Sequence, residues 1–466
     1  MAPKQPYQLT PEQQAAAEEK RRLRAASKAV QQNQVVETHQ RGTIVGREYL
    51  SVSEPEPEGP RLTIMTWNLL AQCLVRRKLF PTSDCLKVNQ RLNMTYEELL
   101  SPRADVICLQ ETDRLEKLLP VLDKAGYDHS YAAGPRKKHG CCIAWRRSIF
   151  SKVASKVLYY DDEPGLSFRT RNIAHIVALR RTDSEDGVIV ATTHLFWHPA
   201  YIYERSRQAA LLQRETRSFR AAHGSSWPAI IAGDFNFAPH EAAYALMLRQ
   251  PLSEAHRAKL SGSRVVHKSV DPAVSAEEIR KPEKVEVAAA AQENTEAEKD
   301  EDGGEGEGEG EEGEEGEEEG GGDPDRVLVN TRPPRPEDGL LEDDELEALY
   351  ALGDEPTPRS AYDEGQRTLA AAGVEDVDLL RCGERLGIDK SSLGAYEPVY
   401  TNYTFYWKLT LDYVFLLDPP GSRSKVLRIL APHKAENLGD GLPKKGISAS
   451  DHVSLAAELQ WTKVEA

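Results

Sequence analysis

Eight polar residues stand where apolar segments of the chain end or begin, and their side chains could take part in chemistry. They are Asn68, Glu111, His194, Asp234, Asn236, Asp412, Asp451 and His452. The set holds carboxylates, carboxamides and imidazoles but no serine or cysteine placed as a nucleophile. Oxygen-rich side chains suit a hard divalent cation, and such an ion assists the attack of water on a phosphate ester. The residue types therefore predict metal-assisted hydrolysis.

Each of these residues, taken alone, also has a structural explanation. A polar residue at the end of a strand is often a turn former or a cap. The tripeptide Ser450-Asp-His occurs by chance in many sequences, and Asp412 is equally well interpreted as a strand-end cap. Only the recurrence of the pattern at several segment ends favours chemistry over structure.

The segments that must position these residues are short strands separated by helices. Strands are predicted over 62–67, 105–109, 141–145, 187–193, 229–232, 413–417 and 453–459 from their apolar runs. Helical patterns lie between them at 114–125, 203–222 and 240–249. The mixed connections do not fit a strictly alternating, doubly wound sheet. The expected fold is α/β, with two packed mixed β-sheets flanked by helices.

The 466 residues are expected to form an N-terminal arm and one large domain. Residues 1–60 are predicted to be a charged helical arm, with a helix over 10–32, followed by a linker. A solvated arm and a helix that docks on a partner or on RNA are both open interpretations. Residues 61–466 are expected to be a single catalytic domain interrupted by an insertion at 270–337, because candidate residues occur on both sides of it.

The insertion carries most of the acidic excess of the chain. The chain has 75 acidic and 59 basic residues, a net charge of −16. Thirteen of the acids lie in residues 300–320, which contain only Asp, Glu and Gly, so the remainder is nearly neutral. Such a segment cannot bury enough apolar surface to order itself, and we expect it to be disordered. Limiting nonspecific adhesion, binding of a basic protein partner and service as a passive linker are the roles left open.

Charge and composition exclude several classes of protein. The nearly neutral remainder excludes binding of nucleic acid by bulk positive charge. No apolar run approaches the ~18 residues of a membrane span, and the first residues lack the apolar core of a signal peptide. Six cysteines without a Cys-x-x-Cys pair indicate reduced thiols. We therefore expect a cytoplasmic or nuclear protein that does not associate with membranes.

The candidate residues occur in six short motifs. In chain order they are Trp-Asn68, Leu-Gln-Glu111, Thr-Thr-His194, Gly-Asp234-Phe-Asn236, Asp412-Tyr and Ser-Asp451-His452. Together and in this order they resemble the endonuclease/exonuclease/phosphatase superfamily, whose fold is a DNase-I-like four-layer α/β sandwich. The resemblance covers about residues 62–460 apart from the insertion.

Further segments resemble one branch of that superfamily. His194-Leu-Phe-Trp-His-Pro199 and Tyr400-Thr-Asn-Tyr-Thr-Phe-Tyr-Trp-Lys are similar to the deadenylase, nocturnin and 2′-phosphodiesterase group. Arg76-Arg-Lys-Leu-Phe-Pro81 is closest to the fungal Ngl-type RNA exonucleases. Phe237 departs from the group, which usually has a small hydroxyl residue there, so the shape of the substrate surface near it does not follow from the resemblance.

The resemblance implies a role for each candidate residue. It implies Mg²⁺, with Mn²⁺ as an alternative, held by Glu111 with Asn68 and Asp451 close to the ion. Asp234 would orient or deprotonate the attacking water, and Asn236 would donate to the phosphoryl oxygens.

The remaining catalytic roles fall to two histidines and one carboxylate. His452, oriented by Asp412, would stabilise the charge of the transition state, as a carboxylate–imidazole pair does elsewhere. His194 would contact the phosphate.

Four residues are candidates for substrate binding. The resemblance places Trp407 at a base-stacking position of the related deadenylases, and Pro199 on the opposite side of that base; core packing is the alternative for Trp407. Lys137 and Lys138, beside His139, are candidate phosphate contacts, although a charge cluster is usually a solvated face.

These expectations combine into a Mg²⁺-dependent 3′→5′ exoribonuclease that acts on the 3′ end of single-stranded RNA and releases nucleoside 5′-monophosphates. Trimming of RNA 3′ ends, in rRNA processing or poly(A) removal, is the expected role. Two alternatives remain: a nucleotide phosphatase or 2′-phosphodiesterase of the same fold, and an inactive scaffold that binds partners through its acidic insertion. The presence of every expected side chain argues against the scaffold.

Overall fold

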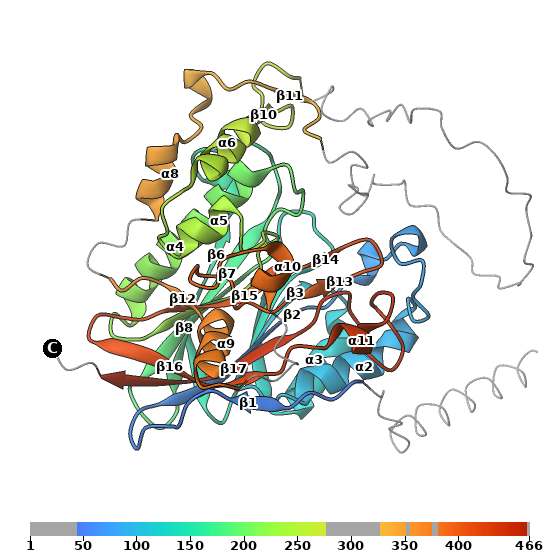
Figure 1. Ribbon diagram of the computed structural model, residues 1–466, viewed down its shortest axis with the longest axis vertical. Helices are drawn as coiled ribbons and strands as arrows, with labels where there is room; N and C mark the ends of the chain where they lie inside the picture. The colour runs from blue at the N-terminus through green and yellow to red at the C-terminus, as the bar shows by residue number, and fades with distance from the viewer. Residues whose placement is uncertain (1–43, 276–326, 351–354, 375–380, 464–466) are drawn as a thin grey trace, which may run out of the picture.

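Two β-sheets form the centre of the protein in the computed structural model, which describes residues 44–275, 327–350, 355–374 and 381–463 (Figure 1). The first sheet consists, in spatial order, of β1 (Tyr49–Ser51), β16 (Ser422–Leu430), β17 (Leu455–Lys463), β2 (Arg61–Asn68), β3 (Val106–Thr112), β5 (Gly140–Arg146) and β4 (Tyr127–Ala132). The second consists of β12 (Arg359–Ser360), β15 (Asp412–Leu417), β9 (Ala229–Asp234), β8 (Gly187–Thr193), β7 (Ile173–Arg181) and β6 (Phe150–Tyr159). Two small antiparallel sheets pair β10 (Val266–His267) with β11 (Thr331–Arg332), and, in a hairpin, β13 (Asn402–Tyr403) with β14 (Lys408–Leu409).

Helices cover the outer faces of both sheets (Figure 1). The helices are α2 (Val88–Leu100), α3 (Leu115–Lys124), α4 (Ile202–His223), α5 (Ala242–Met247), α6 (Glu254–Ser263), α8 (Asp343–Leu349), α9 (Ala361–Ala371), α10 (Cys382–Leu386) and α11 (Ala435–Leu438). Leu118 of α3 packs in one cluster with Ile107 of the first sheet, and Leu212 of α4 packs with Ile231 of the second. The layers therefore run helices, sheet, sheet, helices, which confirms the expected α/β sandwich. None of the helices described combines the length and hydropathy needed to cross a bilayer.

The core between the sheets is made of inward-facing side chains from both. Ile64 and Cys108 of the first sheet share one buried cluster with Val177, Val190 and Ile230 of the second. A strand that is covered on both faces reads as a continuous apolar run. This explains why β3 and β9, which are buried along their whole length, are recognisable in the sequence.

One end of the sandwich collects the ends of the central strands. β2 runs parallel to β3, and β8 runs parallel to β9, so the carboxyl ends of each pair meet at one edge of its sheet. β15 is antiparallel to β9, and β17 is antiparallel to β2. The amino ends of β15 and β17 therefore lie at that same end, where the sequence places its candidate residues.

A short strand precedes the expected start of the domain. Tyr49–Ser51 form β1, and Tyr49 lies opposite Leu430 of β16. The expectation that residues up to 60 form a linker is wrong for this segment, because its backbone pairs with the edge of the first sheet. The helix predicted over 10–32 lies outside the described residues.

The segments that flank the insertion pair with each other as the antiparallel strands β10 and β11. Val266 lies opposite Arg332, and the guanidinium of Arg332 forms ion pairs of 2.6 Å with Asp271 and with Asp338. The disordered range expected at 270–337 is therefore too wide at both ends, because these flanking residues pair with each other. The acidic stretch itself falls within 276–326 and lies outside the described residues.

Candidate active site

The candidate residues lie close together because they stand at the ends of neighbouring strands. Asn68 and Asp234 are the last residues of β2 and β9, and Asp412 is the first residue of β15. Asp412 lies opposite Asp234 in the antiparallel register. His194 follows β8 directly and forms an isolated bridge with Asp234. The sheet topology therefore places side chains from distant parts of the sequence around Asp234.

Glu111 is aimed into the site by an irregularity in β3. The register with β5 shifts between Leu109 and Thr112, and Glu111 has a φ of +50°. A bulge turns a side chain out of the normal alternation, and a positive φ is uncommon for a residue other than glycine. Backbone strain of this kind concentrates at functional sites. The carboxylate is fixed in turn by the backbone N–H of Ala71, which donates to Oε2 at 2.8 Å.

The amide of Asn68 links two carboxylates. Its Nδ2 donates to Oε1 of Glu111 and to Oδ2 of Asp234, both at 3.0 Å. Its Oδ1 accepts from the backbone N–H of Leu70 at 3.0 Å. Because the backbone uses the amide oxygen, Asn68 presents N–H donors to the site. In this arrangement Asn68 orients the two carboxylates.

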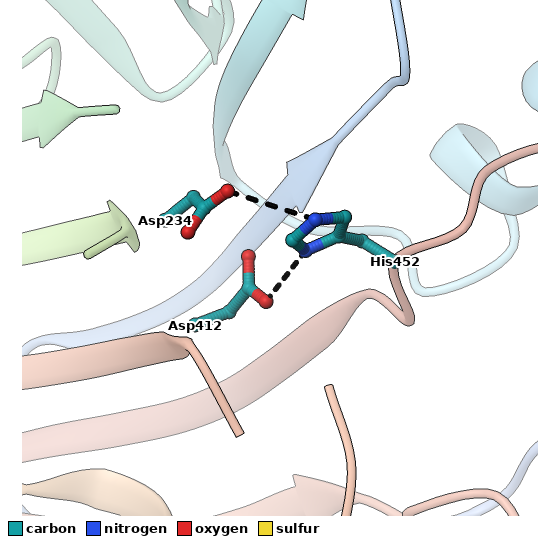
Figure 2. A group of neighbouring side chains, drawn as sticks. All are labelled: Asp234, Asp412 and His452. Atoms are coloured by element: carbon teal, nitrogen blue, oxygen red, sulfur yellow. Dashed lines mark hydrogen bonds and ion pairs between the residues drawn. The ribbon is translucent and has the colours of Figure 1, made fainter. Parts of the chain in front are cut away.

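His452 lies between two aspartates, as Figure 2 shows. Its Nδ1 is 2.8 Å from Oδ2 of Asp412, and its Nε2 is 3.6 Å from Oδ2 of Asp234. All three residues are almost completely buried. Asp412 is held in its turn by Thr401, whose Oγ1 accepts from the backbone N–H of Asp412 at 3.0 Å. Asp412 therefore orients the imidazole, and the imidazole faces Asp234.

Burial and neighbouring charges set the protonation of this group. Burial raises the pKa of Asp234 to about 6; the charge of Asp412 adds to the rise, and His452 opposes it. Burial alone would lower the pKa of His452, but Asp412 and Asp234 raise it well above its ordinary value. A cationic His452 therefore faces a carboxyl group whose pKa is close to neutral, where a general base is most effective.

Glu111 stays ionised despite its burial. Burial alone would raise the pKa of Glu111, but the His194 and His139 rings and the hydrogen bonds from Asn68 and Ala71 hold the pKa below its usual value. His194 lies between the two carboxylates, with Nδ1 at 3.9 Å from Glu111 and Nε2 at 3.6 Å from Asp234.

Two further candidates lie at the rim of this cluster. Asn236 has a φ of +52°; its Nδ2 donates to the carbonyl of Leu195 at 2.9 Å, and its backbone N–H donates to Asp234 at 3.0 Å. One amide hydrogen of Asn236 is thus committed, and the second remains for a ligand. Asp451 accepts from Asn402 at 3.3 Å, and burial raises the pKa of Asp451, with His452 opposing and Glu111 adding to the rise.

Comparison with protein families identifies the family to which these site residues belong. The profile of the Endonuclease/Exonuclease/phosphatase family matches residues 65–452, from β2 to His452 and on both sides of the insertion. The chain belongs to this family. The match includes every catalytic and metal candidate named above, so the family assignment and the geometry concern the same residues.

Curated relatives within the family include fungal RNA exonucleases. A probable RNA exonuclease of Schizosaccharomyces pombe is 40% identical over 229 residues, which cover 46% of this chain and 45% of the relative. The RNA exonuclease NGL2 of Saccharomyces cerevisiae is 36% identical over 245 residues, covering 46% and 48%. The human 2′,5′-phosphodiesterase 12 is 26% identical over 230 residues, covering 43% and 37%. The chain spans about half the length or less of these relatives. The expected resemblance to Ngl-type RNA exonucleases is confirmed.

Solved structures support the fold. The crystal structure of ANGEL2, a 2′,3′-cyclic phosphatase, aligns with a TM-score of 0.57 at 17% identity and covers 90% of this chain and 99% of that chain. At this identity the likeness concerns the fold alone, and it confirms the DNase-I-like sandwich.

The family's divalent cation has two candidate positions among the described residues. Asp234, Asp412 and His452 offer ligand atoms within 4.8 Å of one another, but His452 and Asp412 are already hydrogen-bonded to each other. Glu111 is ionised, faces the open side of the site and has the charge of Asp451 nearby. Mg²⁺ prefers one or two carboxylates completed by water and substrate oxygens. The residues present therefore fit a divalent cation at Glu111, with Asp451 as the second carboxylate.

An open hollow lies beside Glu111. Its lining includes two of the sequence candidates, His194 and Lys137, and also His139, Arg171 and Asn172, which the sequence had not singled out as functional. Lys137 donates to Oδ1 of Asn172 at 2.6 Å. His139 precedes β5 and Asn172 precedes β7, so the signal that found the other residues, a polar side chain at a strand end, was present at both.

The other substrate candidates differ in their exposure to solvent. Trp407 is half-buried, and Pro199 and Lys138 are exposed; Lys138 is not part of the lining of the hollow. Phe237 is completely buried and stacks on Tyr413 with the ring centroids 5.4 Å apart. The departure of Phe237 from the family pattern is therefore accommodated in the core and leaves the surface of the site to other side chains.

Proposed function

We propose that the protein is a divalent-metal-dependent phosphodiesterase that hydrolyses RNA from its 3′ end and releases nucleoside 5′-monophosphates. The family assignment supports phosphoester hydrolysis. The similarity to proteins named RNA exonucleases supports RNA as the substrate. Because those relatives match over only about half their length, the substrate and the products are both part of the proposal.

The observation that carries this proposal is the environment of Asp234. Asn68, His194 and His452 surround its carboxylate, and burial raises its pKa to about 6. A carboxylate with this pKa can accept a proton from water as the water attacks the phosphate near neutral pH. The site therefore favours direct attack by water on phosphorus.

The thiol at the hollow does not offer a competing nucleophile. Cys141 lines the hollow, but burial raises its pKa to about 12. A thiol with this pKa remains protonated at neutral pH, and the thiolate is the reactive form. A covalent intermediate on Cys141 is therefore disfavoured.

The other residues of the site would stabilise charge on the phosphate. The cationic His452, held by Asp412, faces the position where negative charge grows, and the second N–H of Asn236 is available to a phosphoryl oxygen. A divalent cation at Glu111 would act as a Lewis acid on the scissile phosphate. Asn68 would keep Glu111 and Asp234 at a fixed separation while these charges develop.

Hydrolysis of a labelled oligonucleotide tests the proposal. Purified protein is incubated with 5′-labelled oligo(A) in Mg²⁺, in Mn²⁺ or in EDTA, beside the Asp234→Asn variant. We expect a ladder that shortens from the 3′ end and needs a divalent cation and Asp234, with nucleoside 5′-monophosphate as the small product. Internal cuts from the earliest times, or cleavage that persists in Asp234→Asn, would contradict it. Oligo(U) in parallel separates poly(A) specificity from general trimming.

A nucleotide phosphodiesterase or phosphatase is the second candidate, because the hollow beside Glu111 carries Lys137 and Arg171 and can take an additional phosphate. The similarity to 2′,5′-phosphodiesterase 12 agrees with this reading. Incubation with a 2′-phosphorylated dinucleotide separates the two candidates. Release of phosphate from the dinucleotide with an intact oligo(A) would favour the second.

A further inference from the structure

Two aromatic rings stand exposed at the tip of the β13–β14 hairpin. Phe405 is 48% exposed and Tyr406 is 55% exposed. They are the two central residues of the turn from Thr404 to Trp407, where Gly, Asn, Asp, Pro or Ser is usual. Among the described residues, no other two exposed aromatic side chains are neighbours in the chain. Turn chemistry therefore does not explain why these residues are aromatic.

The backbone of this turn is tightly held. Thr404 donates its backbone N–H to the carbonyl of Trp407 at 2.7 Å, and its Oγ1 accepts from the backbone N–H of Trp407 at 2.8 Å. Gly441 packs so closely that a β-carbon there would lie 2.5 Å from the backbone nitrogen of Phe405. Leu442 donates its backbone N–H to the carbonyl of Tyr403 at 2.8 Å. The rings are thus presented on a fixed backbone, which lowers the entropy cost of binding a ligand.

The hairpin is built directly on the catalytic segment. Asn402 forms a backbone bridge with His452, and its side chain donates to Asp451. Tyr403 donates its backbone N–H to the carbonyl of Asp451 at 2.8 Å. Phe405 is three residues beyond Asn402, so its backbone lies within about 10 Å of this contact along the chain. The tip is therefore within reach of a polymer whose end occupies the site.

The side chains at the tip are of types that contact nucleic-acid bases and phosphates. The rings of Phe405 and Tyr406 are 5.0 Å apart and nearly perpendicular, and the Trp407 ring lies 5.7 Å from that of Tyr406. Lys408 follows in β14 and is exposed, with its ammonium 4.6 Å from the centroid of the Tyr403 ring, and residues 400–411 contain no acidic side chain. Exposed rings with a nearby cation are how proteins bind single-stranded nucleic acid without reading its sequence.

We propose that Phe405 and Tyr406 form a stacking platform for bases of single-stranded RNA that lie on the 5′ side of the nucleotide being removed. The proposal rests on the proposed function and extends it, since the expected base contact at the reaction centre concerns Trp407 and Pro199 alone. The platform makes affinity depend on the length of the RNA. A dinucleotide does not reach the two rings, whereas a longer strand does.

The experiment compares two substrates in four proteins. Initial rates are measured for oligo(A) of about ten nucleotides, within the usual range of single-strand site sizes, and for a dinucleotide. The proteins are wild type, Phe405→Ala, Tyr406→Ala and, as matched control, Tyr159→Ala, an aromatic residue on β6 that is 39% exposed. We expect each hairpin variant to raise KM for the longer RNA at least about fivefold, the effect of losing one stacked base. The kcat values and the turnover of the dinucleotide should not change, and Tyr159→Ala should match wild type.

Binding in EDTA separates failure of this proposal from failure of the proposed function. Fluorescence anisotropy of labelled oligo(A) needs no turnover, so the hairpin variants should weaken binding by the same factor even in a protein that hydrolyses neither substrate. Equal effects on both substrate lengths, or unchanged binding, would overturn the platform. Concentration-dependent dimers of wild type that Phe405→Ala and Tyr406→Ala abolish would also overturn it, because the rings would then serve a protein interface.

Discussion

His452 and Asp412 are forty residues apart in the sequence, yet Nδ1 of the imidazole lies 2.8 Å from Oδ2 of the carboxylate in a buried pair. Asp412 opens β15 and His452 precedes β17, so the contact joins the two sheets. The other oxygen of Asp412 is buried and has no hydrogen-bond partner among the described residues. Among the described residues the carboxylate of Asp412 is therefore hydrogen-bonded to His452 alone, and its proposed role is to orient the imidazole.

Replacing Asp412 with Asn should remove most of the activity and leave substrate affinity nearly unchanged. The neutral amide no longer stabilises the cationic imidazole or fixes its orientation, so we expect kcat to fall about 10²- to 10⁴-fold. Steady-state kinetics on oligo(A) gives the separate kcat and KM values. Asp440→Asn, at an exposed position, is the matched control. A wild-type kcat in Asp412→Asn would show that the pair is structural.

Glu111→Gln should uncouple the protein from its divalent cation without unfolding it. Gln keeps an acceptor for the backbone N–H of Ala71 but loses the charge, and we expect the affinity for Mg²⁺ to fall at least about tenfold. Because a ligand that binds only the folded state raises the melting temperature, Mg²⁺ should stabilise wild type against heat and fail to stabilise the variant. Glu116→Gln, exposed on α3, should behave as wild type. An undiminished Mg²⁺ shift in Glu111→Gln would place the ion elsewhere.

Arg91→Lys should destabilise the segments that support Glu111 and Asp451. The buried guanidinium of Arg91 donates to the carbonyls of Ala449, Leu69 and Leu70 and to Oε1 of Gln72. A single ammonium cannot reach all these acceptors, and each buried acceptor left without a donor costs about 1–3 kcal/mol.

Urea unfolding measures this loss. We expect the free energy of unfolding of Arg91→Lys to fall by about 2–4 kcal/mol, with a parallel loss of activity. Arg423→Lys, at an exposed arginine of β16, controls for the substitution itself. If both variants unfold at the wild-type urea concentration, the network around Arg91 contributes little.

Glu397 should make stability depend on pH. Burial raises the pKa of Glu397 to about 8 from 4.5, with Asp363 adding to the rise, and Tyr244 donates to its Oε1 at 2.8 Å. Between these two values the folded state holds a proton that the unfolded state has released, so stability falls as the pH rises from about 4.5 to 8, by up to about 1.4 kcal/mol per pH unit. Glu397→Gln keeps an acceptor for the hydroxyl of Tyr244 but has no proton that titrates.

Melting temperatures from pH 5 to 8 test this expectation. The variant should lose less stability than wild type as the pH rises, and a wild-type slope in Glu397→Gln would mean that another group titrates.

The sequence was informative for β3, β8 and β9, which are covered on both faces, although β7, equally buried over most of its length, was missed. β8 has the predicted bounds, and β3 and β9 differ from theirs only at the ends, because buried strands read as apolar runs. β4 and β6 were missed because their exposed faces carry polar side chains such as His129 and Lys152. β1 was missed because its three residues show no regular apolar pattern, and they form a strand only by pairing with β16.

The site was predictable in its members but not in its hydrogen bonds. Residue types and strand ends identified Glu111, Asp234 and His452, and the family motifs gave their order. The positive φ of Glu111 and the amide orientation of Asn68 depend on tertiary contacts that no local pattern records. Asn172 was missed because the strand that it precedes, β7, had not been predicted.

The pairing of β10 with β11 has a consequence for insertions and deletions in the segment between them. On the two sides of residues 276–326 the backbones of β10 and β11 are one strand spacing apart, about 4.8 Å, and Arg332 forms an ion pair with Asp271. A change in the length of the segment between these two strands need not alter the register that places Asp412 opposite Asp234. Insertions and deletions can therefore accumulate at this point at little cost to the fold.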